Sequence, residues 1–267
     1  MKIATWNVSG GAALPWYKNS KISQETVDKI MNEDADIFVI TEIVLASGWD
    51  YLEKKMKENN YVWFSSFVSG SNGFLILVKK ELIDGVGNLA KNLWHKNETL
   101  QIYNDIGLMK VSFKMKNNTN CTVCGFRMLI GNNKGKAQYG KAKYDDMRKI
   151  LYKKVLPIAE ECYLENDVVI FAGDFNNARY LEDYKGKDQI NYNWQILKSK
   201  FVNIGYEMLD VDDQGNPINT KLNPPASPID HIFAKGFIKQ TCKVLPQSKG
   251  YDHVILLVEG IVGSSEN

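Results

Sequence analysis

Five apolar runs of this 267-residue chain each begin or end at a side chain that can bind a cation or a phosphate group. Neighbouring strand ends of a sheet share one edge, so we expect these side chains on a single rim, where open crevices hold ligands. Any one of them has an ordinary structural explanation, because Asp and Asn hydrogen-bond local backbone at strand ends and turns. A shared site explains all five ends together better. The residues are Asn7, Glu42, Asp174, Asn176, Asp230, Asp252 and His253.

The rest of the pattern alternates short strands with helices, which is typical of mixed sheets covered by helices. No repeat, low-complexity tract or Pro/Gly/Ser-rich linker divides the chain, so we expect one α/β domain over residues 1–267. One predicted helix starts at about residue 23, and the others are 49–59, 143–164 and 194–201. The predicted strands are 3–8, 35–40, 61–67, 74–78, 106–115, 121–130, 168–171, 229–234, 243–245 and 254–258.

Composition narrows the class of protein. With 33 Lys+Arg against 31 Asp+Glu, the net charge of +2 argues against a polycation that coats nucleic acid or membrane by charge alone. A 44% apolar content with 24% charged residues is typical of a folded protein, and no apolar run is long enough for a membrane span. The N-terminus reads as a strand and not as an export leader, which predicts a cytoplasmic location.

Four cysteines are then expected as free thiols in a reducing compartment. Cys121 and Cys124 have the spacing of half a zinc site, but the chain offers no second pair to complete it. They also lie on a predicted strand, where residues three apart point to opposite faces. We therefore expect both thiols to be packing residues.

The polar residues at the strand ends suit a hard cation. Several carboxylates and an amide oxygen, with one imidazole and no thiolate, favour Mg²⁺ over zinc, with Mn²⁺ as an alternative ion. Mg²⁺ keeps several waters and needs only one or two carboxylates plus a phosphate oxygen. The remaining Asp and His residues could activate a water and bind the phosphate charge. This chemistry indicates hydrolysis of a phosphate ester.

The motifs around these residues resemble, in order, those of the endonuclease/exonuclease/phosphatase superfamily, which includes exonuclease III-like and deoxyribonuclease I-like enzymes. The resemblance runs from residue 3 to residue 258 and implies a four-layer α/β sandwich, in which two packed mixed sheets are flanked by helices. It also implies a metal-dependent phosphodiesterase or phosphatase. The segments that carry it are Thr5-Trp6-Asn7-Val8, Ile40-Thr41-Glu42, Gly173-Asp174-Phe175-Asn176, Ile229-Asp230-His231 and Tyr251-Asp252-His253.

The resemblance also implies roles for single residues. Glu42 would be the principal metal ligand, with Asn7 and Asp252 beside it. Asp174 would position or deprotonate the attacking water, and Asn176 would hold the phosphate. His253 would contact the scissile phosphate, oriented by Asp230.

Two positions depart from the family pattern. Thr41 stands where Gln usually precedes the metal-binding Glu, and Arg127 stands where a His or Tyr usually touches the phosphate or assists the leaving group. An Arg cannot be a general acid at neutral pH, but it can clamp a phosphate through two parallel hydrogen bonds. We expect that clamp; the alternative is that Arg127 is a surface residue.

The substrate is the least constrained prediction. The stretch 132–143 carries four Lys and no acid, and Lys185 and Lys187 follow the Asp174 turn. Beside a phosphate-ester site such residues favour nucleic acid as the substrate, with Trp16 and Tyr17 as candidate contacts. A small-molecule or lipid phosphate is the alternative, and a catalytically silent binding protein of the same fold is the second. No protein partner and no membrane segment are inferred, and His231 and His95 are expected to be structural and solvated, respectively.

Overall fold

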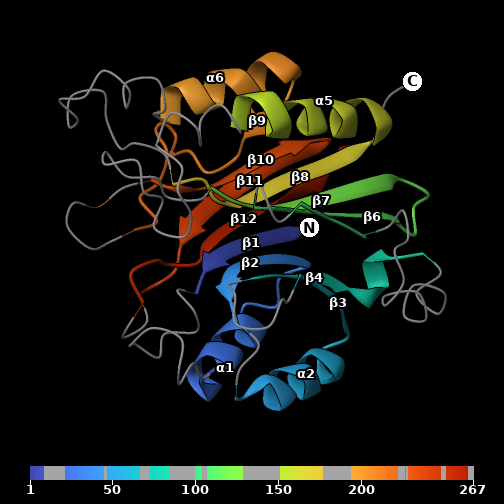
Figure 1. The fold of residues 1–267 in the computed structure, drawn as a ribbon, viewed down its shortest axis with the longest axis vertical. Coiled ribbons are helices and arrows are strands. Elements are labelled where there is room, and N and C mark those ends of the chain that lie inside the picture. The colour runs from blue at the N-terminus through green and yellow to red at the C-terminus, as the bar shows by residue number, and fades with distance from the viewer. Residues whose placement is uncertain are drawn as a thin grey trace.

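The computed structural model describes residues 1–8, 22–44, 47–66, 73–84, 100–103, 107–128, 151–176, 194–221, 226, 228–247 and 251–263. Its strands and helices form four layers, with α1 and α2 covering one sheet and α5 and α6 covering the other (Figure 1). The predicted fold class, a sandwich of two packed mixed sheets flanked by helices, is confirmed. No helix in the described ranges is both long and apolar enough to span a membrane.

The first sheet has six strands in the order β11-β12-β1-β2-β4-β3. Strands β1 and β2 are parallel, and the other neighbours in this sheet are antiparallel. The strands are β1 Lys2–Asn7, β2 Ile37–Ile43, β3 Tyr61–Ser65, β4 Gly73–Lys79, β11 Phe237–Val244 and β12 Leu256–Val262. Its helices are α1 Gln24–Asn32 and α2 Trp49–Glu58, and a 3₁₀ turn spans Lys80–Leu82.

The second sheet also has six strands, in the order β5-β6-β7-β8-β10-β9. Here β7 and β8 form the parallel pair, and the other neighbours are antiparallel. The strands are β5 Leu100–Tyr103, β6 Leu108–Lys114, β7 Asn120–Arg127, β8 Val168–Asp174, β9 Glu207–Met208 and β10 Asp230–Lys235. Its helices are α5 Leu156–Glu165, preceded by a π-helical turn Leu151–Val155, and α6 Trp194–Ile204.

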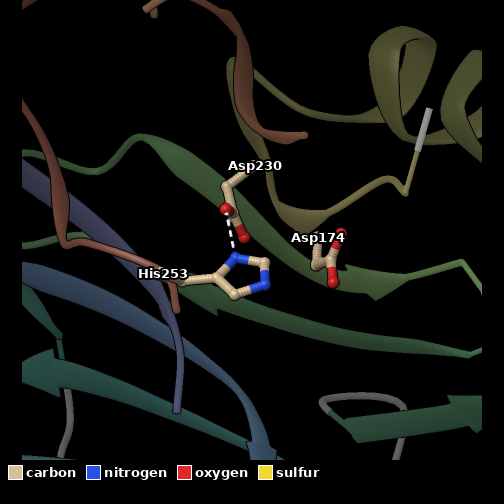
Figure 2. A group of neighbouring side chains, drawn as sticks. All are labelled: Asp174, Asp230 and His253. Carbon is tan, nitrogen blue, oxygen red and sulfur yellow. Dashed lines mark hydrogen bonds and ion pairs between the residues drawn. The ribbon is translucent and has the colours of Figure 1, made fainter. Parts of the chain in front are cut away.

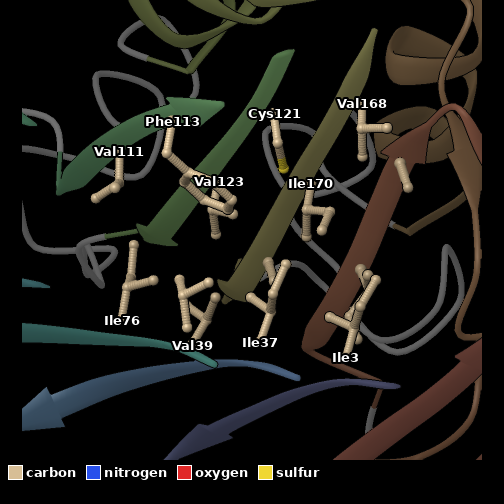
Figure 3. Close-up of a cluster of buried hydrophobic side chains, with 14 of the residues drawn as sticks. Ile3, Ile37, Val39, Ile76, Val111, Phe113, Cys121, Val123, Val168 and Ile170 are labelled. Carbon is tan, nitrogen blue, oxygen red and sulfur yellow. The ribbon is translucent and has the colours of Figure 1, made fainter. Parts of the chain in front are cut away.

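Three apolar layers hold the sheets and helices together, since the central strands of both sheets bury both faces. The central layer lies between the sheets, where Ile37 and Val39 of one sheet face Val123 and Ile170 of the other (Figure 3). A second layer lies between the first sheet and α1 and α2, and a third between the second sheet and α5 and α6. Cys121 and Cys124 confirm the strand argument, because Cys121 belongs to the central layer and Cys124 to the helix-covered one.

Most predicted elements are present, and a few strands differ from the prediction in length or were not predicted. Ser23 caps α1, since its hydroxyl accepts a hydrogen bond from the Thr26 N–H at 3.1 Å. The predicted helix 143–164 is described only from residue 151. The strands β5 and β9, of four and two residues, were not predicted, and β11 is longer than the predicted 243–245.

Candidate active site

The two parallel strand pairs carry most of the site at their carboxyl ends. In the first sheet, Asn7 ends β1 opposite Thr41 of β2, and Glu42 follows Thr41. In the second sheet, Arg127 ends β7 opposite Asp174, which ends β8. Since β1 lies against β8 and β10, these ends meet across the sandwich. Ligands commonly bind outside the carboxyl ends of strands in such sheets.

Glu42 reaches the site through an irregularity in β2. The pairing with β4 shifts between Thr41 and Ile43, which leaves Glu42 as an extra residue in the strand. Its φ of 57° is left-handed, an uncommon conformation for a residue that is not Gly or Asn. A bulge of this kind bends a strand and redirects a side chain, and bulges recur next to active sites.

The segment 173–176 forms a tight turn whose residues each have a different task. A Cβ on Gly173 would lie 2.0 Å from the Phe126 carbonyl oxygen, and its φ of 140° also favours Gly. Phe175 is fully buried in the layer below α5 and α6. Asn176 adopts φ 44°, and its backbone N–H donates to Asp174 Oδ1 at 2.8 Å. The turn thereby helps to hold the Asp174 carboxylate in place.

Hydrogen bonds connect the carboxylates of the two sheets. The Asn7 amide donates to Glu42 Oε1 at 3.1 Å and to Asp174 Oδ2 at 2.8 Å. The Asn176 amide donates to the same Asp174 oxygen at 3.0 Å and to the Met128 carbonyl at 2.9 Å. The structure thus brings Asn7, Glu42, Asp174 and Asn176 together, as the sequence predicts.

His253 and Asp230 form a buried pair beside Asp174 (Figure 2). The His253 Nδ1 lies 2.7 Å from Asp230 Oδ2, and ligand atoms of Asp174, Asp230 and His253 lie within 4.8 Å of one another. Burial by itself would lower the pKa of His253, but the charge and hydrogen bond of Asp230, with Asp174 and Asp252, raise it to about 9. The imidazole is therefore a cation at neutral pH, which suits it to contact a phosphate.

The surroundings of Asp174, by contrast, disfavour the charged form of its side chain. Its burial, together with the negative charges of Asp230 and Glu42, raises its pKa to about 7, although His253 and Arg127 act to lower it. A carboxyl group with this pKa can exchange a proton near neutral pH, which is what a general base requires.

The remaining predicted residues lie at the margin of this cluster. Asp252 Oδ2 lies 3.9 Å from His253 Nε2 and 3.7 Å from the Lys221 ammonium. Arg127 is buried, so the surface alternative for it is wrong; its guanidinium contacts Glu42.

Sequence reasoning missed Thr220, which is fully buried. It hydrogen-bonds to the backbone at Asp230 and at Val254, the residue after His253. Its hydroxyl accepts from the Asp230 N–H at 3.0 Å and the Ile229 N–H at 3.4 Å, and its carbonyl accepts from the Val254 N–H at 2.9 Å. A threonine far from the motifs gives no sequence signal for such a role.

His231 is fully buried, as expected for a structural residue. Its Nδ1 lies 2.7 Å from Asp210 Oδ2, and its ring lies 5.6 Å from the Phe175 ring. The Asp210–His231 pair thus supports the turn that carries Asp174. Trp16, Tyr17, His95, the lysine-rich stretch 132–143, Lys185 and Lys187 lie outside the described residues.

The residues fit a divalent cation in their chemistry. Glu42, Asn7 and Asp252 offer only oxygen ligands, which hard cations prefer. The Asp230 Oδ1 atom is buried without a hydrogen-bond partner among the described residues, and Asp174 has a raised pKa. Both features indicate an excess of negative charge that a cation would neutralise.

A comparison of the sequence with models of protein families identifies the class of this protein. Residues 4–251 match the model of the endonuclease/exonuclease/phosphatase family. The chain belongs to this family, whose enzymes act on phosphate esters and typically use divalent metals.

Solved structures show the same fold at low sequence identity. An endonuclease/exonuclease/phosphatase from Beutenbergia cavernae DSM 12333 superimposes with a TM-score of 0.65 at 14% identity, covering 99% of this chain and 72% of that one. An AP endonuclease from Archaeoglobus fulgidus gives 0.61 at 15%, covering 97% and 99%. The 3′ phosphatase NExo from Neisseria, bound to a product DNA hairpin, gives 0.61 at 13%, covering 98% and 99%. No curated protein matches the chain.

Proposed function

We propose that this protein is a divalent-metal-dependent phosphodiesterase that cleaves nucleic acid. The observation that carries the proposal is the convergence of side chains from β1, β2, β7, β8, β10 and the segment before β12 on one cluster. The cluster combines a carboxyl group of raised pKa, a buried imidazolium and a guanidinium. That combination suits water activation beside a phosphate.

In this mechanism Asp174 accepts a proton from the attacking water, held in place by the Asn7 and Asn176 amides. The imidazolium of His253, fixed by Asp230, contacts a phosphate oxygen and stabilises the negative charge that develops there. Arg127 binds a further phosphate oxygen, whereas both amide N–H groups of Asn176 already donate to Met128 and Asp174, so Asn176 positions Asp174. The His253 imidazolium, fixed in advance by Asp230, needs little reorganisation during the reaction.

Glu42, Asn7 and Asp252 would hold the ion, Mg²⁺ or Mn²⁺. When bound, it supplies a Lewis acid that withdraws charge from the phosphate. The pKa of Asp174 is raised by burial first and then by the charges of Asp230 and Glu42, and a cation held here would offset the charge part.

Nucleic acid is proposed as the substrate on two grounds. The chain has a lysine-rich stretch at 132–143 that follows the strand of Arg127 in sequence. Two of the similar structures are described as an AP endonuclease and a 3′ phosphatase with product DNA. One experiment tests substrate and mechanism together: a plasmid-nicking assay beside a phosphate-release screen of small and lipid phosphates, each with Mg²⁺ and with EDTA.

The Asp174→Asn variant is the mechanistic arm of that experiment. We expect a loss of at least about 10²-fold in turnover with an unchanged circular dichroism spectrum, because the general base is removed. Asp50→Asn on the exposed side of α2 is the matched control and should retain full activity.

The outcomes separate the alternatives. Metal-dependent nicking that Asp174→Asn abolishes supports the proposal, whereas phosphate release without nicking points to a small-molecule or lipid phosphatase. A wild-type protein that is inactive in every assay, and thus indistinguishable from Glu42→Ala, would indicate a silent binding protein. Substantial activity left in Asp174→Asn contradicts the role given to Asp174.

A further inference from the structure

The contact between Arg127 and Glu42 has no place in the mechanism above. Two nitrogens of the guanidinium reach one oxygen: Nε lies 2.9 Å and Nη2 2.7 Å from Glu42 Oε1. The Arg127 and Glu42 side chains are only 9% and 16% exposed, so solvent screens the pair weakly. Arg127 therefore lies on the residue proposed as the principal metal ligand.

The coordination of Glu42 Oε1 is already filled. This oxygen accepts from both Arg127 nitrogens and from the Asn7 amide at 3.1 Å. A carboxylate oxygen has about two lone-pair directions, so three donors leave none for a cation. A divalent ion that uses Oε1 has to displace them.

The donors differ in how readily a cation can displace them from Glu42 Oε1. Asn7 is neutral, so a bound cation repels its amide far less than it repels a guanidinium. The guanidinium of Arg127 is positively charged and has no acceptor atom, so a bound cation can only repel it.

We propose that Arg127 is an internal competitor of the divalent ion for Glu42, and that the substrate phosphate removes this competition by taking over the guanidinium. The inference rests on the proposed function. A fork of parallel N–H donors binds a phosphate as well as a carboxylate, so the phosphate offers Arg127 a new partner as it leaves Glu42. Metal and phosphate then bind cooperatively, each raising the affinity for the other by the same factor.

The test measures Mn²⁺ binding by isothermal titration calorimetry, with no assay of activity. We expect Arg127→Met to bind Mn²⁺ at least tenfold more tightly than the wild type. Arg127→Gln, which retains a neutral donor, should fall between the two and serves if Arg127→Met does not fold. Saturating inorganic phosphate should raise Mn²⁺ affinity in the wild type and have a much smaller effect in Arg127→Met.

Lys110→Met is the matched control. Lys110 is also a buried cation of the second sheet, but its partner is Glu161 of α5 at 2.9 Å. Removing its charge should leave Mn²⁺ affinity within about twofold of wild type. An equal gain in Lys110→Met would mean that the total charge, and not the Glu42 contact, sets the affinity, which overturns the proposal.

Equal or weaker Mn²⁺ binding in both Arg127 variants also overturns it. A wrong assignment of the metal site would give a different result. If Glu42→Gln binds Mn²⁺ as the wild type does, Glu42 is not the ligand, and the proposed function loses its metal site.

Discussion

Two site residues adopt a left-handed backbone conformation. Glu42 has φ 57° and Asn176 has φ 44°. Left-handed conformations of residues other than Gly cost on the order of 1–3 kcal/mol and cluster at functional sites. Asn tolerates the region well, but Glu does not, so the fold accepts strain at Glu42 to aim a carboxylate at the site.

The paired imidazole predicts how metal-free protein responds to pH. The pKa of His253 rises from 6.5 to about 9 on folding, so its stabilising contribution is complete below pH 6.5 and is lost as pH rises through 9. The pKa of Asp174 rises from 3.8 to about 7, so its effect also makes the folded state less stable as pH rises, but between pH 4 and 7. Above pH 7 the loss is dominated by His253.

We therefore expect the unfolding free energy of wild-type protein in EDTA to fall between pH 7 and 9.5, by at most about 3 kcal/mol from this residue. Urea titrations at the two pH values measure it. His253→Gln should show a clearly smaller fall. Equal falls in the two proteins would contradict the raised pKa of His253.

At the scale of elements, the close approach of β7 and β8 determines where Asp174 lies. The Gly173 backbone meets the Phe126 carbonyl so closely that a Cβ would lie 2.0 Å away. Gly173→Ala should destabilise the protein by about 3 kcal/mol or more, because either the pairing or the turn must distort. Chemical denaturation measures this loss.

Gly215→Ala is the control for backbone conformation alone. Gly215 also has a left-handed φ, of 82°, but nothing lies within 4 Å of its Cβ position. We expect a cost of only about 1–2 kcal/mol there. Comparable costs at the two glycines would show that the β7 contact does not matter.

A second element-scale prediction concerns the segment around Thr220, which joins the start of β10 to the residues that carry His253. Thr220→Val removes the acceptor of two buried N–H groups, at a cost of about 1–3 kcal/mol. We expect kcat to fall about tenfold with little change in KM, because Asp230 loses its fixed position. Thr220→Ser restores the hydroxyl and should restore kcat; if it does not, Thr220 acts through packing.

The sequence predicts elements well where apolar runs are long. The runs that end at Asn7, Glu42 and Asp174 are central strands buried on both faces, which produces a continuous pattern. The edge strand β11 buries only Phe237 and has half-buried or exposed residues elsewhere, and β9 has only two residues, so neither gives a strong signal. The bulge at Glu42 also has no local signature, since Glu is not a residue that favours a left-handed backbone.

At the scale of the whole molecule, the site is formed by residues of both sheets. Asn7 and Glu42 come from one, and Arg127, Asp174 and Asp230 from the other. The motif order predicts which residues meet. It does not predict that Arg127 bonds Glu42 or that Thr220 joins two segments, because those contacts depend on the distance between strands far apart in sequence.

A ligand that binds only the folded state should stabilise the entire fold. We expect Mg²⁺ or Mn²⁺ at 100 times its Kd to add about 2.7 kcal/mol to the unfolding free energy and to raise the Tm by several degrees. Differential scanning calorimetry with metal and with EDTA measures the shift. Glu42→Gln should lose it; a shift of the same size in that variant would place the ion elsewhere.

The two sides of β7 give the chain natural chemical reporters. Cys121 lies in the layer between the sheets, and Cys124, three residues later, in the layer below the helices. A thiol reagent can reach Cys121 only when the two sheets separate, while Cys124 becomes accessible when α5 alone lifts away. The relative labelling rates of these two thiols would therefore distinguish a local opening from a loss of the sandwich itself, without any introduced probe.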